Sequence, residues 1–147
     1  MNQQNRLCLI PFQLFLLILC QALSANPEAE QLYNAGLAYY QQKNYLQAIE
    51  QLEGAIELEP DNPQYQHILA VSYGRAAEQA NWFSAIGLAR KTLEHLEIAA
   101  NLDKHNLEIL DDLMDYYREA PIFLGGDRKK ADEIENLIEK LSQNKEE

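Results

Sequence analysis

The side chains that could do chemistry in this chain are few and lie far apart. The histidines, His67, His95 and His105, fall in different predicted elements. Glu94 precedes His95, but no second histidine follows at the spacing that binds zinc on a metalloprotease helix. We therefore expect surface or groove histidines, and we predict no metal site and no cofactor.

Serines and carboxylates give no sign of an active site either. No nucleophile elbow, P-loop or dinucleotide-binding glycine pattern is present, and the serines after residue 25 stand in unrelated contexts: Ser72, Ser84 and Ser142. Asp111, Asp112 and Asp115 gather on one predicted helix without an EF-hand loop, so we expect solvated acids there. The sequence predicts no catalytic residues, and an enzyme on a repeat scaffold is the least favoured hypothesis.

The elements that position these residues are helical. Residues 29–62 form one predicted helix–turn–helix unit, whose second helix has apolar residues at helical spacing: Ile49, Leu52, Ala55 and Ile56. The small residues Gly36 and Ala48 allow the two helices to approach closely. A turn is expected between Tyr40 and Tyr45, and Pro60 ends the unit.

This unit resembles a tetratricopeptide repeat (TPR). That family has a Gly or Ala, an aromatic residue, an Ala and a Pro in a fixed order within a 34-residue unit. The residues that match this order are Gly36, Tyr39, Ala48 and Pro60. The resemblance implies an all-α TPR solenoid of helix–turn–helix repeats, with about three repeats and about six helices.

Two further repeats are predicted, each with an insertion. The second spans residues 63–106, with about ten additional residues and a long helix from about Ser84 to Asn101. The third spans residues 107–141, and its first helix must stop before Pro121. A charged last helix would then cap the stack.

Residues 121–127 form a predicted loop in the third repeat. We expect Gly125 and Gly126 to break the helix. We expect Ile122, Phe123 and Leu124 to fold onto the core. The alternative is an apolar loop presented to a partner.

The first 25 residues have the pattern of a secretion signal. Arg6 precedes an apolar run from Leu7 to Leu19, and small residues end at Ala25. We expect residues 1–25 to be a signal peptide and residues 26–147 to be an exported TPR domain, periplasmic or secreted. Both cysteines, Cys8 and Cys20, lie in the leader. Bacterial lipoprotein signals have a small residue before the lipidated cysteine, whereas Leu19 precedes Cys20, so lipid anchoring is the alternative.

The composition is acidic, with a formal net charge of −11. Such a surface repels phosphate backbones and anionic headgroups. We expect no nucleic-acid partner, and membrane association only if Cys20 is lipidated.

In the TPR family the first helices of successive repeats line a concave groove that binds extended peptides or helices. Carried over unit by unit, the resemblance implies a protein-binding groove formed by Tyr33, Leu37, Tyr40, His67, Val71, Arg75, Asp111, Asp115 and Arg118. One end would be aromatic and the other acidic, which suits a protein or peptide with basic and apolar residues. The family's clamp for chaperone carboxylates uses Lys and Asn, whereas Tyr33 and Leu37 stand here, so that ligand class is not expected.

The favoured hypothesis is therefore an exported adaptor that binds another protein and does no chemistry. The alternative is a membrane-anchored lipoprotein that helps to assemble a cell-envelope complex, which would require Cys20.

Overall fold

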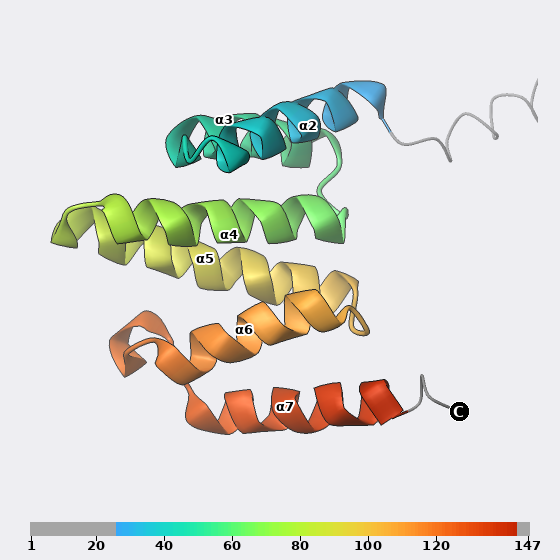
Figure 1. Cartoon of the computed structure of the whole chain (residues 1–147), viewed down its shortest axis with the longest axis vertical. Coiled ribbons are helices and arrows are strands. Elements are labelled where there is room, and N and C mark those ends of the chain that lie inside the picture. The colour runs from blue at the N-terminus through green and yellow to red at the C-terminus, as the bar shows by residue number, and fades with distance from the viewer. Residues whose placement is uncertain (1–25, 144–147) are drawn as a thin grey trace, which may run out of the picture.

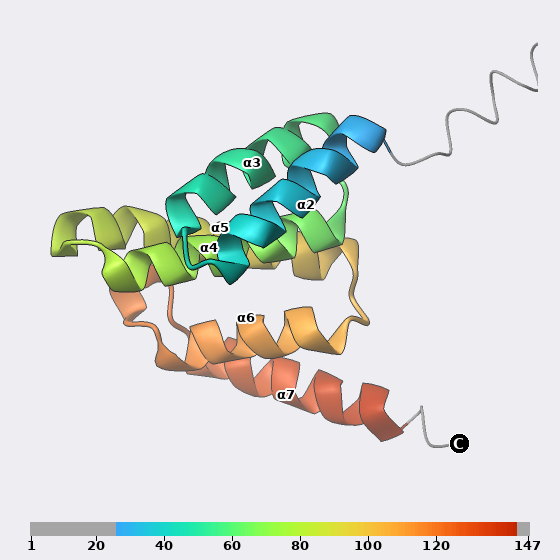
Figure 2. The ribbon, with the colours of Figure 1, turned by 45° about the horizontal axis from the view of Figure 1, so that its top comes forward.

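The computed structural model describes residues 26–143, which form a stack of paired helices (Figure 1). The helices in chain order are α2 (Pro27–Gln41), α3 (Tyr45–Leu58), α4 (Pro63–Gln79), α5 (Trp82–Leu102), α6 (Leu107–Glu119), the 3₁₀ helix η2 (Ile122–Leu124) and α7 (Arg128–Gln143). The pairs α2–α3, α4–α5 and α6–α7 follow one another along the stack (Figures 1 and 2). The predicted all-α solenoid is confirmed. The expected leader with Cys8 and Cys20, and residues 144–147, lie outside the described residues.

Asparagine caps fix most of the helix starts. The side chains of Asn26, Asn62, Asn81 and Asn106 each accept a backbone N–H from the first turn of the following helix. Pro27 and Pro63 add a first-turn proline to α2 and α4. These signals explain why the expected helices appear where the sequence places them, although α5 begins at Trp82 rather than about Ser84.

Close packing inside the first pair depends on small residues. A Cβ atom added to Gly36 would lie 2.6 Å from Cγ of Leu52. Ala48 and Leu52 are fully buried beside it and belong to the core that joins α3 to α4. The expected roles of Gly36 and Ala48 as contact points between helices agree with this geometry.

A repeated tyrosine clamp joins successive pairs. The Tyr73 hydroxyl of α4 donates to Glu53 of α3, and Lys91 of α5 donates to the Tyr73 oxygen at 2.8 Å. One pair further along, the Tyr117 hydroxyl donates to Glu97, and Lys130 donates to the Tyr117 oxygen at 3.0 Å. Each clamp therefore connects three helices drawn from two successive pairs.

The outer helices carry neutral residues at the matching positions. Ala48, Thr92 and Ala131 are buried at the same position of α3, α5 and α7. The residue just before this position is a lysine in α5 and α7, Lys91 and Lys130, but Gln47 in α3. Glu53 and Glu97 stand five residues after Ala48 and Thr92, so Asn136 is the matching residue of α7. The clamp is thus complete only inside the stack.

The two insertions of the sequence pack on each other. The α4–α5 pair extends past the end of α2–α3 (Figure 1). On its other side, the Tyr116 hydroxyl donates to the carbonyls of Ala89 in α5 and Leu124 in η2. The rings of Trp82 and Phe123 lie 6.5 Å apart. The loop of the third pair therefore supports the longer helices of the second.

The expected burial of that loop is wrong for two of its three apolar residues. Ile122 is 89% exposed and Phe123 is 56% exposed, while Leu124 alone is partly buried. A hydrogen bond from Gly126 N to the Pro121 carbonyl at 3.1 Å closes the loop, and Gly125 adopts a positive φ of 96° that permits the turn. So tight a turn directs only one side chain inward.

Across residues 26–143, no helix combines the length and apolar character that a bilayer crossing needs.

Candidate functional site: the cleft between α4 and α6

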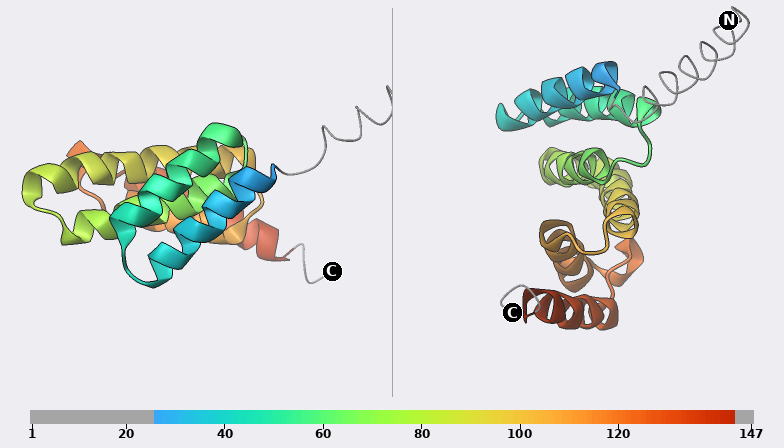
Figure 3. Two further views of the ribbon diagram at one scale, coloured as in Figure 1. Left: turned by 90° about the horizontal axis from the view of Figure 1, so that it is seen from above. Right: turned by 90° about the vertical axis from the view of Figure 1, so that its right-hand side faces the viewer.

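The cleft lies between α4 and α6, with α5 as its floor. In the right-hand view of Figure 3, α4 (green) and α6 (orange) lie on one side of the stack and α5 (yellow) on the other. The cleft has a volume of about 380 Å³. Its floor includes Ala89, Thr92 and Leu96 of α5, and Leu124 of η2 closes one end. An apolar floor between two helices can accept an apolar side chain.

The walls of the cleft are acidic. Asp112, Asp115 and Glu119 come from α6, and Glu78 comes from α4. Arg75 is the only basic residue among the described lining residues, and it pairs with Glu78 at 3.1 Å. The phenol of Tyr40 and the carboxylate of Glu78 raise the pKa of the Arg75 guanidinium. The cleft therefore has an excess of negative charge.

Three of the expected groove residues share this cleft: Val71, Arg75 and Asp115. Of the expected groove aromatics, neither Tyr33 nor Tyr40 lines the cleft, although the Tyr40 phenol raises the pKa of Arg75.

The other aromatic positions pack partly against the core. The rings of Tyr33 and Tyr65 stack with centroids 4.7 Å apart, and Tyr33 contacts two core clusters. Tyr40 lies 5.6 Å from Tyr45, and Leu37 is half-buried. These contacts hold α2 against α3 and α4, so the aromatic end is more a packed wall than an open surface.

His67 is not the surface or groove histidine that the sequence suggested. It is 1% exposed, and its Nε2 lies 2.6 Å from Oδ2 of Asp112 on α6. No described residue bonds its Nδ1. This contact links α4 to α6 below the cleft and directs the Asp112 carboxylate, so His67 positions the wall and offers no accessible surface to a partner.

Asp111 and Arg118 lie outside the cleft. Arg118 pairs with Glu135 of α7 at 3.1 Å, and Asp111 is exposed but lines none of the described pockets. The residues of α6 that face the cleft are instead Asp112, Asp115, Tyr116 and Glu119. The expected face of α6 is therefore displaced by about one residue, or about 100° around the helix.

Sequence reasoning missed Glu78, Glu119 and the Tyr116 hydroxyl. Asp112, Asp115 and Glu119 recur at i, i+3 and i+7, so a helical-period search for acids would have found that stripe. Tyr116 gave no comparable signal, because its partners are carbonyl groups on two other elements.

The histidines and carboxylates of the described residues do not gather as metal ligands. Within residues 26–143, no group of histidine, cysteine and carboxylate side chains converges as a metal site would require. His95, the histidine beside Glu94, shares a hydrogen bond of 2.7 Å between its Nδ1 and Gln66 and stacks on Tyr73. Burial lowers the pKa of His95, so the neutral imidazole is favoured in the fold.

Comparison with known families identifies the repeat. The sequence model of the TPR repeat matches residues 36–76, which run from the second half of α2 through α3 into α4. No curated protein matches the chain. The chain therefore contains TPR repeat sequence, and its stacked helix pairs are those of a TPR-type solenoid.

Proposed function

We propose that this protein is an exported adaptor that binds a protein partner in the α4–α6 cleft. The single observation that carries the proposal is the cleft itself, in which carboxylates on two walls surround an apolar floor. TPR repeats generally mediate protein–protein interaction, which supports binding rather than catalysis as the role of this scaffold.

The chemistry of the cleft defines the partner. A basic side chain would pair with Asp115 and Glu119, while an apolar side chain would cover Ala89 and Leu96. Charge pairing at exposed carboxylates mainly raises the association rate, and apolar burial slows dissociation. The partner segment therefore carries both basic and apolar residues.

Site-specific photo-crosslinking tests the position of the partner. A benzophenone side chain in place of Val71, which lines the cleft, should capture a partner in the cell. The same group at Glu57, which is exposed on α3 and lines no described pocket, is the matched control. Equal capture from both positions, or capture from Glu57 alone, would remove the cleft as the binding site.

Export is proposed from the leader pattern of residues 1–25. Cleavage after Ala25 would leave Asn26, whose side chain caps α2, as the new N-terminus. N-terminal sequencing of the exported protein decides between Asn26 and a lipid-modified Cys20. The second outcome would show a membrane-anchored lipoprotein and favour the alternative, an assembly factor of an envelope complex.

A further inference from the structure

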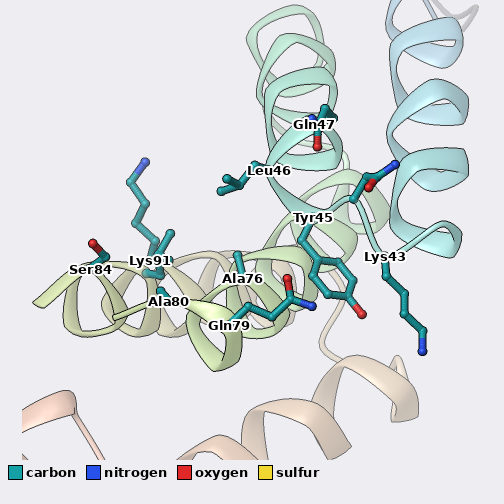
Figure 4. A pocket seen from close by; sticks show the side chains of 12 residues that line it. Lys43, Tyr45, Leu46, Gln47, Ala76, Gln79, Ala80, Ser84 and Lys91 are labelled. Atoms are coloured by element: carbon teal, nitrogen blue, oxygen red, sulfur yellow. The ribbon is translucent and has the colours of Figure 1, made fainter. Parts of the chain in front are cut away.

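The longer second pair creates another pocket outside the cleft. Because α4 and α5 extend past the turn between α2 and α3, their ends form a ledge beside the first turn of α3 (Figure 1). The pocket on this ledge has a volume of about 700 Å³, and we call it the ledge pocket. Figure 4 shows side chains from α3, α4 and α5 around it. It shares no lining residue with the cleft.

The ledge pocket has the opposite charge to the cleft. Among the described residues that line it, Lys43 and Lys91 are the only charged ones, and no carboxylate is present. The chain as a whole has 23 acidic and 12 basic side chains, so this lining departs from the rest of the surface. Lys91 pairs with Glu53 at 3.3 Å, whereas Lys43 forms no ion pair with any described residue. Lys43 therefore provides a positive charge at the edge of the pocket, where its side chain points away from Leu46 in Figure 4.

The start of α3 adds hydrogen-bond donors to the same pocket. Asn44 precedes α3 but its side chain accepts no bond from the first turn, unlike the asparagines before α2, α4, α5 and α6. Tyr45, Leu46 and Gln47, which carry first-turn N–H groups, line the pocket. Uncapped N–H groups at a helix start favour a negatively charged group.

An apolar surface lies next to these donors. Leu46 is 68% exposed and extends over the ledge in Figure 4. Ala76, Ala80 and Leu88 form the apolar part of the lining below it. An apolar ligand side chain would remove Leu46 and these neighbours from water, which is favourable in proportion to the area buried.

We propose that the ledge pocket binds a segment of a second partner protein in which an Asp or Glu stands beside an apolar residue. The carboxylate pairs with Lys43 and the start of α3, and the apolar side chain covers Leu46 and Ala80. The charge of the lining selects the acidic segment, since the basic partner of the cleft would be repelled here. The protein would then hold two partners of opposite charge on separate surfaces.

Gly87 allows the pocket to be blocked without disturbing the fold. It lines the pocket, and a Cβ added there meets no atom within 4 Å. Gly87→Glu places a negative charge and a side chain in the pocket, and Gly87→Ala is the neutral control. Neither variant should lower the melting temperature, because glycine inside a helix is less stable than either replacement.

Peptide display on the full chain supplies the probe. A random peptide library is selected on the native chain after depletion on Gly87→Glu. The surviving peptides should be enriched in Asp or Glu next to an apolar residue. They should bind Gly87→Ala as they bind the native chain, and bind Lys43→Glu about tenfold more weakly. Survivors that are basic, that lack acids, or that are absent altogether would overturn the proposal.

Two controls distinguish binding in this pocket from binding in the cleft and from self-association. Asp115→Asn, in the cleft, should leave the affinity of the selected peptides unchanged, so failure of one site does not imply failure of the other. Sedimentation of the chain alone tests self-association. If the native chain dimerises and Gly87→Glu abolishes the dimer, the occupant is a second copy and the proposed partner is wrong.

Discussion

The ammonium group of Lys91 lies 4.7 Å from the centroid of the Tyr73 ring and donates to its hydroxyl at 2.8 Å. That hydroxyl donates to Glu53 of the preceding pair. The same contacts recur at Tyr117, whose ring centroid lies 4.7 Å from the ammonium of Lys130. The interface between helix pairs thus combines apolar packing with a fixed polar contact.

Removing a single oxygen atom from the clamp should measurably lower the stability of the fold. Tyr73→Phe removes the hydroxyl that joins Glu53 to Lys91, and should lower the free energy of unfolding by about 1 kcal/mol. Tyr39→Phe is the matched control, because Tyr39 holds the same repeat position but is 37% exposed. Urea denaturation gives both values. Equal losses for the two variants would show that the clamp adds no stability.

Overpacking should disturb the contact between α2 and α3. Ala48→Leu inserts bulk at a fully buried position beside Gly36 and Leu52, and should cost about 1–3 kcal/mol. Glu53→Leu is not a suitable control, because Glu53 accepts a hydrogen bond from Tyr73 and pairs with Lys91. Glu50→Leu, at an exposed position of α3, is the better control. Comparable thermal shifts for Ala48→Leu and Glu50→Leu would contradict the helical register.

Stability should depend on pH through His95. Burial lowers the pKa of His95 below 6.5 despite the opposing effect of Glu94, so the unfolded chain takes up a proton first as the pH falls. The contribution of neutral His95 to the free energy of unfolding is therefore complete above pH 6.5 and declines below it. His95→Gln should flatten this decline, whereas His105→Gln, at an exposed position, should not.

The measurement is the melting temperature across a pH series from about 7 to about 5. The Tyr73 hydroxyl lowers the pKa of Glu53 below 4.5, so its contribution is lost only at lower pH and does not overlap this series. A slope that is the same for the native chain and His95→Gln would assign the pH dependence to another group.

Cleft electrostatics should control the association rate. Asp115→Asn combined with Glu119→Gln removes two carboxylates from the cleft wall. The double variant should bind the partner that is crosslinked at position 71 more slowly, and the association rate should depend less on salt. Asp111→Asn removes one carboxylate outside the cleft and is the control for a change of charge elsewhere on α6. Stopped-flow kinetics at several salt concentrations separates these cases. Identical salt dependence for all three proteins would place the partner elsewhere.

Much of the fold follows from local sequence signals. Asn62 and Pro63 mark the start of α4, and Pro121 ends α6, because caps and prolines act on their own neighbours. Gly36 and Ala48 identified the close contact between α2 and α3, because these helices follow each other directly in the sequence.

The candidate site was less predictable, because its geometry depends on contacts between pairs. The apolar period of α6 does not show that Arg118 turns to Glu135, or that His67 is buried against Asp112. The period of α3 marks Glu53 as polar, but not as the acceptor for Tyr73 in another repeat. The ledge pocket likewise arises from the unequal lengths of two helix pairs, a property that belongs to neither pair alone.

Neutral residues at the two outer clamp positions bear on how copies of this protein could associate. Repeats that accept a neighbour on both faces can continue from one molecule to the next as an open filament. Here such a joint would bring Asn136 of one copy to Tyr39 and Gln47 of another, where the inner joints have a glutamate and a lysine. Head-to-tail growth would therefore lack the polar contacts that hold the inner pairs together.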